Sequence, residues 1–229
     1  MKPTASNLIR WAGLSAVAAG VIFAGIQPIH PPDFLPSVTT AAWAMIMPVK
    51  LAMSLLFLAG IAGLYARQVE ESGWLGLAGF LALSVSWTLQ TAFIFAEAFI
   101  LPVLATTAPQ FVESVLGIFN GFPGEMNLGA LPTVYTVVGL LYMLGGVLFG
   151  IATLRARVLP RWAGALLAVA AAMTPAAALL PHAIQRFAAV PVGLALAWLG
   201  YALWSERRGQ ASQPAPATGS PQLRHSGAN

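Results

Sequence analysis

The residues of this chain whose types could support chemistry are ionisable side chains inside long apolar stretches. Lys50 lies well within an apolar stretch at 41–66, and Glu97 lies near the end of another at 74–100. A charge at the centre of a bilayer costs about 3 kcal/mol on insertion scales, so Lys50 is expected to face other helices and to meet a counter-charge there. Glu97 is the natural partner, with Gln90 able to complete the contact. Such a pair can serve a bound molecule or a proton pathway, or it can only fix the register of two helices.

The expected counter-charge belongs to a polar stripe along one predicted helix. Its spacing places the members of the stripe on a single helix face. They are Ser86, Gln90, Phe93 and Glu97. Another apolar stretch carries Tyr135 and Tyr142 on one face, and Pro48 and Pro175 predict kinks in their helices. These features suit helices that border an internal cavity, and they are also ordinary in closely packed bundles.

Further titratable residues lie in the segments expected at the outer ends of the helices, near the Glu97 end of this stripe. They are His30, Asp33, Glu113, Glu125, His182 and Arg186. His30, Glu97 and His182 are expected at similar heights, where they would form a two-His-one-carboxylate arrangement if they converged. No HxxxH or ExxH spacing accompanies them, so neither a metal nor a cofactor is predicted. The predicted ligand-binding residues are Lys50, Gln90, Glu97, His30, Asp33, Glu125, His182, Tyr135 and Tyr142.

The composition indicates an integral membrane protein. Of the 229 residues, 58% are hydrophobic and 8% are charged, and the mean hydropathy is +0.78, whereas about a quarter of the residues of a soluble domain are charged. The absence of cysteine excludes disulfides, thiolate metal sites and cysteine nucleophiles. The net charge of +4 comes from basic residues scattered over short connections, which argues against a nucleic-acid partner.

Six apolar stretches are long enough to cross a bilayer core of about 30 Å as helices. They cover about 8–29, 41–66, 74–100, 132–154, 162–181 and 187–205. A Trp-x-Gly sequence starts three of them, at Trp11, Trp74 and Trp162, which predicts three related hairpins whose glycines allow close helix packing. The predicted fold is therefore all-α, a polytopic bundle of six transmembrane helices within residues 1–208.

The basic residues predict an orientation for this bundle. With both termini in the cytoplasm, nine of the eleven Lys and Arg residues lie on the inner side. Of the other two, Arg186 lies on the outer side and Lys50 lies within a helix. This distribution follows the positive-inside rule, so an arrangement with both termini inside is predicted.

Two segments are expected outside the bundle. In the long outer connection between the third and fourth membrane helices, apolar residues share one helical face between Pro109 and Pro123, which predicts an interfacial helix. Its polar face is expected to include Ser114. Residues 209–229 are rich in Gly, Ala, Ser and Pro, which predicts a disordered cytoplasmic tail.

Two short strings resemble stretches of other membrane proteins. Residues 63–68 (GLYARQ) and 154–162 (LRARVLPRW) look like segments of uncharacterised multi-pass proteins of high-GC bacteria, and the excess of Arg over Lys fits such a genome. The resemblance implies a multi-pass protein of the bacterial cytoplasmic membrane. It implies no activity and transfers no functional residue.

Three functional hypotheses follow from these residues. The leading one is binding or transport of a small amphipathic or lipid-like molecule through a pocket in the outer half of the bundle, near Glu97 and Lys50. The second is a membrane-embedded enzyme acting on a lipid or isoprenoid in the manner of terpene cyclases, with Glu97 or Glu125 as the acid. The third is an accessory subunit of a larger membrane complex. A homodimer is a further alternative, because six short helices need a partner if they alone do not enclose a pathway.

Overall fold

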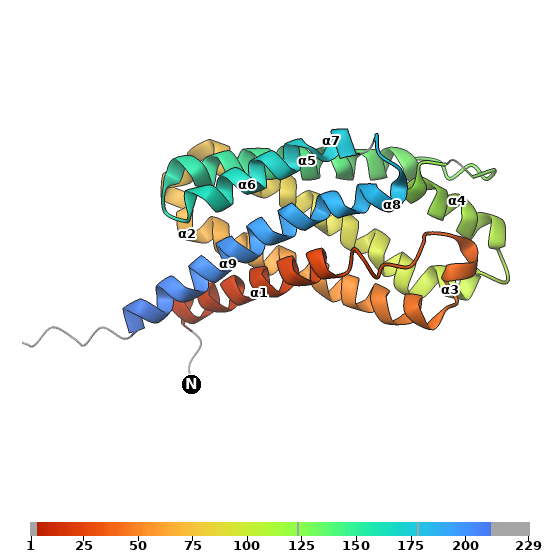
Figure 1. The fold of residues 1–229 in the computed structure, drawn as a ribbon, viewed down its shortest axis with the longest axis horizontal. Coiled ribbons are helices and arrows are strands. Elements are labelled where there is room, and N and C mark those ends of the chain that lie inside the picture. Colours follow the sequence, from red (N-terminus) through yellow and green to blue (C-terminus); the bar gives the residue numbers. More distant parts are fainter. Residues whose placement is uncertain (1–3, 123, 178, 212–229) are drawn as a thin grey trace, which may run out of the picture.

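The computed structural model describes residues 4–122, 124–177 and 179–211, and this part of the chain is helical, with no strand in it (Figure 1). The elements are α1 (Ala5–Gly25), η1 (Leu35–Ser37), α2 (Ala41–Phe95), η2 (Ala96–Ile100), α3 (Leu101–Leu104), α4 (Pro109–Asn120), α5 (Leu131–Ala156), α6 (Arg161–Ala172), α7 (Thr174–Ala177), α8 (His182–Gln185), η3 (Arg186–Ala188) and α9 (Ala189–Ala211). Four segments of the described chain are long and apolar enough to cross a membrane: Ser6–Gly25, Ala41–Leu104, Leu131–Ala156 and Arg186–Glu206. The all-α prediction is therefore confirmed.

The longest of these segments folds back on itself. Its backbone leaves helical angles at Gln68 and at Gly73, whose φ of 57° is a value that glycine adopts without a steric penalty. Side chains pair across the two arms that result: Ser54 with Thr91, at 3.0 Å between hydroxyl oxygens, Phe57 with Trp87, and Tyr65 with Phe80. The first arm (41–67) and the second arm (74–95) of α2 therefore run antiparallel, where the sequence predicted two separate helices.

The helices form a ring in which neighbours in sequence are neighbours in space. Gly60 on the first arm of α2 packs on Ala16 of α1, and Gly79 on the second arm packs on Phe149 of α5. Helices α5 and α6 also lie side by side, and α9 closes the ring by packing against both α6 and α1 (Figure 1). This arrangement leaves an interior that side chains from all of the long helices can reach.

Glycines set the closest approaches in this ring. A Cβ atom built on Gly200 of α9 would lie 2.6 Å from the carbonyl oxygen of Gly13 in α1, and one built on Gly164 of α6 would lie 2.9 Å from that of Gly150 in α5. Any larger residue would separate these pairs of helices. The predicted role of Gly13 and Gly164 in close packing is therefore confirmed.

Two apolar cores fill the ring at different levels. The larger core joins α1, α2, α5, α6 and α9 in the half of the bundle that contains both ends of the described chain (Figure 1). The smaller core lies at the opposite end, beneath α4, and consists of Val38, Trp43, Met47, Leu101, Val112, Val115 and Leu116. Along α2, Lys50 lies between Met47 of the smaller core and Met53 of the larger one.

The predicted helix at 162–181 is broken in the structure. Helix α6 ends at Ala172, and only the single turn of α7 follows it, so the uninterrupted apolar helix is 12 residues long. Pro175 explains the break, because it has no N–H for a helical hydrogen bond and its ring collides with the preceding turn. Around Pro48, by contrast, the backbone of α2 keeps helical angles. The first predicted helix is also shorter than 8–29, since α1 ends at Gly25.

The helix predicted between Pro109 and Pro123 is present as α4, and it ends at Gly121, whose φ is 73°. Its apolar side is buried in the smaller core, as expected. The expectation for Ser114 was wrong, because this side chain is buried and its Oγ accepts a hydrogen bond of 3.1 Å from the N–H of Met126. Ser114 thereby anchors the loop that follows α4.

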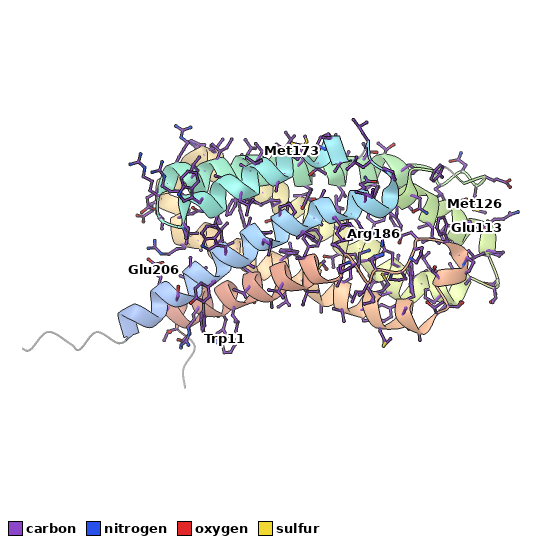
Figure 2. All side chains as sticks on the ribbon, in the orientation of Figure 1. Trp11, Glu113, Met126, Met173, Arg186 and Glu206 are labelled. Carbon is purple, nitrogen blue, oxygen red and sulfur yellow. The ribbon has the colours of Figure 1, made fainter. Side chains whose placement is uncertain are left out.

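Exposed aromatic and charged residues mark one end of the molecule. Trp11, Trp74 and Trp162 are all largely exposed, and Figure 2 shows Trp11 and Glu206 at the opposite end from Glu113 and Met126. Glu206 forms an ion pair with Arg67, whose Nε donates to it at 3.0 Å. Helix α9 continues to Ala211, so residues 209–211 of the predicted tail are helical, and 212–229 lie outside the described residues.

Candidate functional site

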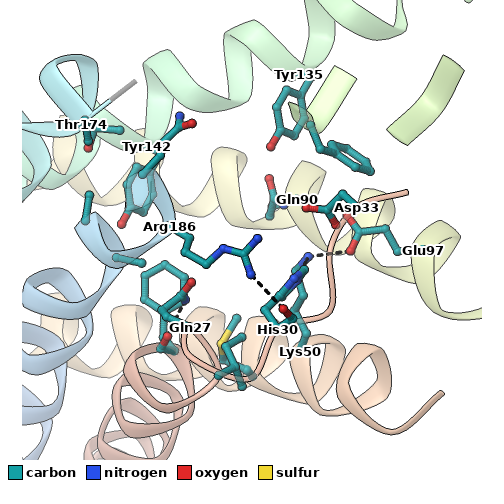
Figure 3. A pocket seen from close by; sticks show the side chains of 18 residues that line it. Gln27, His30, Asp33, Lys50, Gln90, Glu97, Tyr135, Tyr142, Thr174 and Arg186 are labelled. Atoms are coloured by element: carbon teal, nitrogen blue, oxygen red, sulfur yellow. Dashed lines mark hydrogen bonds and ion pairs between the residues drawn. The ribbon is translucent and has the colours of Figure 1, made fainter. Parts of the chain in front are cut away.

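The centre of the site is an ion pair between the first arm of α2 and η2, which continues the second arm. Lys50 Nζ lies 2.6 Å from Glu97 Oε2, and only 16% and 2% of the two side chains are exposed. His30 Nε2 lies 3.4 Å from the same ammonium group (Figure 3). The predicted partnership of Lys50 and Glu97 is confirmed, and it needs no bridging by Gln90.

A π-helical turn positions Glu97. In a regular α-helix its carbonyl would accept the N–H of Leu101, but that N–H bonds instead to Ala96, five residues earlier. The next residue, Pro102, has no N–H to offer. The free carbonyl of Glu97 accepts the indole N–H of the fully buried Trp43 at 2.8 Å. π-Turns of this kind occur frequently at functional sites.

His30 follows α1 and is neutral. Its Nδ1 lies 2.7 Å from the carbonyl oxygen of Pro31, so Nδ1 carries the proton and Nε2 accepts from Lys50. Burial, and after it the charge of Lys50, lowers the pKa of His30 from 6.5 to about 4. The ring therefore completes the hydrogen bonding of the ammonium group without adding a charge.

Arg186 joins the site from the start of η3. Its Nη1 donates a hydrogen bond of 2.8 Å to the carbonyl oxygen of His30, which ties the segment after α1 to the segment before α9. Sequence reasoning did not include Arg186 among the ligand-binding residues. The sequence did mark Arg186 as unusual, because it was the one basic residue that the predicted topology assigned to the outer side.

A cavity with two connected lobes surrounds these residues. The charged lobe has a volume of about 280 Å³, and its polar lining includes Gln27, His30, Asp33, Lys50, Glu97 and Arg186 (Figure 3). The aromatic lobe has a volume of about 310 Å³, and its lining includes Phe23, Met53, Trp87, Ile94, Val138 and Tyr142. Lys50, Gln90 and both tyrosines line both lobes, so one molecule could extend from the first into the second.

Several polar groups of the wall have no partner in the part of the chain that the structure describes. Within the described residues, the side chains of Gln90, Tyr135 and Tyr142 form no hydrogen bond. Figure 3 shows both tyrosine hydroxyls directed towards the space around Arg186 and Gln90. Tyr135 is held there by edge-to-face packing on Phe93, with the ring centroids 5.3 Å apart. These groups can offer hydrogen bonds to a bound molecule.

Most of the predicted site residues line this cavity. The lining includes Lys50, Gln90, Glu97, His30, Asp33, Tyr135 and Tyr142. Glu125 does not belong there: it is exposed in the loop after α4, where Ser114 holds the neighbouring residue. His182 begins α8, but its side chain lies outside the described residues, so its convergence with His30 stays a prediction.

The acids and histidines of the described part of the chain form no cluster of three that could hold a metal ion. No family model, no curated protein and no solved structure matches this chain.

Proposed function

We propose that this chain is a six-span protein of the bacterial inner membrane that binds or moves a small amphipathic molecule in the cavity beside Lys50 and Glu97. Both termini are cytoplasmic in this proposal. Cavities of a few hundred Å³ with apolar walls and a few converging polar groups are typical of small-molecule sites. An ionisable pair at membrane depth is by default a candidate functional site.

The fold supports six spans in the following way. The two arms of α2 supply two antiparallel spans, and α6 with α7 supplies one that is interrupted at Met173. The end that carries Trp11 and Glu206 also carries the basic segments around Arg67 and Arg161, as expected for a cytoplasmic face. Helix α4 then lies at the outer interface, over the smaller core.

The observation that carries the proposal is the position of the ion pair in the wall of a cavity. A pair that only fixed the register of two helices would gain nothing from an adjoining space, because close packing is the ordinary state of a protein interior. Here Lys50 lines both lobes, and so do Gln90 and Tyr142, whose polar atoms have no hydrogen-bond partner among the described residues. The proposed role of these groups is to hold the polar part of the molecule.

The enzymatic alternative has less support. Acid catalysis on an isoprenoid needs a protonated carboxyl group, whereas Glu97 accepts a hydrogen bond from the ammonium group of Lys50 at 2.6 Å, as an ionised carboxylate does. Glu125, the other candidate acid, is exposed outside the cavity. Binding or transport requires neither group to be an acid.

Native mass spectrometry of the protein in lipid nanodiscs tests the proposal. We expect a co-purified organic mass on the wild-type protein that is lost in Glu97→Gln and in the double variant Lys50→Met/Glu97→Gln. Glu206→Gln is the matched control, because it breaks the ion pair at the other end of the bundle and should retain the mass. A wild-type protein that carries no such mass, and that is stabilised by no amphipathic compound, would contradict the proposal. The same spectra distinguish a monomer from a homodimer and would show an associated subunit.

A further inference from the structure

We infer that the molecule bound in this cavity is an amphipathic anion, with its acidic group at Arg186 and its apolar part in the aromatic lobe. This inference rests on the proposed binding function and adds the charge and the orientation of the ligand. Its basis is the distribution of charged side chains along the wall of the charged lobe.

The two cations of the charged lobe differ in what neutralises them. The charge of Lys50 is matched by Glu97 at 2.6 Å. Arg186 donates to a neutral carbonyl, that of His30, and forms no ion pair within the described residues. A guanidinium group has five N–H donors, so most of the donors of Arg186 are available to a ligand.

The guanidinium group is directed into the cavity. Figure 3 shows the Arg186 side chain extending from the side of Tyr142 into the space in front of Gln90, with its guanidinium end towards Gln90 and His30. The planar fork of arginine matches carboxylate and phosphate groups through paired hydrogen bonds. Tyr142 and Gln90 add neutral donors that have no partner within the described protein.

The acids of the lobe define which side an anion would occupy. Figure 3 shows Asp33 and Glu97 together on the side of Lys50, beyond the guanidinium end of Arg186. An anionic group near them would be repelled, whereas one at Arg186 would meet a positive charge. The acidic group is therefore confined to one part of the charged lobe.

The aromatic lobe determines the other half of the ligand. Apart from Lys50, which lines both lobes, its wall is formed by uncharged side chains such as Met53, Trp87 and Ile94. Trp87 packs against Phe57 and Phe23, with ring centroids 4.3 and 5.6 Å away, so this wall is built of packed aromatic rings. An unbranched alkyl chain or a flat apolar ring system fits such a space, and a second charge would be costly there.

Binding of four ten-carbon probes to the protein in nanodiscs tests this inference. The probes are decanoate, decyl phosphate, decanol and decylamine, and their partition into protein-free nanodiscs is subtracted. We expect the wild-type protein to bind decanoate or decyl phosphate at least tenfold more tightly than decanol, and decylamine least. Whichever anion binds better distinguishes a carboxylate from a phosphate ligand, and either result supports the inference.

Variants assign the preference to Arg186. In Arg186→Gln the affinity for the anions should fall roughly ten- to hundredfold, as for the loss of charged hydrogen bonds, while that for decanol changes less than about twofold. Arg186→Lys should give intermediate affinity if the glutamine variant does not fold, and Arg67→Gln is the matched control with unchanged binding. Equal wild-type affinity for decanoate and decanol would overturn the inference and leave the proposed function intact. Failure of all four probes would count against the proposed function itself.

Discussion

Trp43 and Glu97 are joined by a hydrogen bond that links the first arm of α2 to η2. The indole N–H of Trp43 donates to the main-chain oxygen of Glu97 at 2.8 Å, while the side chain of the same glutamate receives Lys50. The π-turn frees this oxygen, and Pro102 leaves it without a backbone donor. The same turn thus provides the main-chain oxygen that binds Trp43 and positions the carboxylate that binds Lys50.

Trp43→Phe should destabilise the protein by about 1–3 kcal/mol, because it leaves a buried carbonyl without a donor and keeps most of the ring packing. The measurement is the unfolding free energy in detergent. Trp74→Phe, at a side chain that is 85% exposed, is the control and should have little effect. Equal stability of the two variants would show that the Trp43 hydrogen bond contributes nothing.

Replacing Glu97 alone should lower the free energy of unfolding more than replacing Lys50 and Glu97 together. Glu97→Gln alone leaves the ammonium group of Lys50 buried without its counter-charge and should cost about 3–5 kcal/mol. Lys50→Met/Glu97→Gln removes both charges and should recover much of that loss. A double-mutant cycle in detergent measures the coupling. The pair of Arg67 and Glu206 is more exposed and should give about 1 kcal/mol or less in the same cycle.

Gly20→Ala should destabilise the protein, because Gly20 lies where α1 packs closely against α9. A Cβ atom there would overlap the carbonyl oxygen of Gly193, and the helices would have to separate, at a cost of about 1–3 kcal/mol. Gly25→Ala in the same helix is the matched control, because a Cβ atom at Gly25 has no neighbour within 4 Å. Thermal unfolding of the two variants compares them directly, and a similar loss in both would contradict the close packing.

Acidification should destabilise the protein through His30. Its pKa is about 4 when folded and 6.5 ordinarily, so between these values the unfolded chain binds more protons than the folded protein. The free energy of unfolding therefore falls as the pH drops from 6.5 towards 4, by at most about 1.4 kcal/mol per pH unit for one proton. Lys50 and Arg186 oppose protonation of the ring, and Asp33 favours it.

His30→Gln provides the test of this pH dependence, because it removes the titrating group and keeps a polar side chain. Its stability should vary less with pH than that of the wild type between pH 6.5 and 4.5. Parallel curves for the two proteins in thermal unfolding would mean that another group is responsible.

The amino-acid sequence by itself determined the class of this protein and its central contact. Apolar length decides which segments can cross a bilayer, so the helices could be located from composition and periodicity. The pairing of Lys50 with Glu97 could be predicted because an unpaired charge in such a helix is costly and few partners exist. The close packing of α1 at Gly13 could be predicted because glycine has no side chain to keep a neighbouring helix at a distance.

Only the tertiary structure decided how the site is completed. The carbonyl that the π-turn frees at Glu97 takes its donor from Trp43, 54 residues away in the chain, and no local pattern encodes that contact. Arg186 joins the cavity because its segment binds the carbonyl of His30, and Glu125 stays outside because Ser114 anchors its loop elsewhere. These outcomes depend on hydrogen bonds between distant segments, whereas sequence periodicity reports only the faces of single helices.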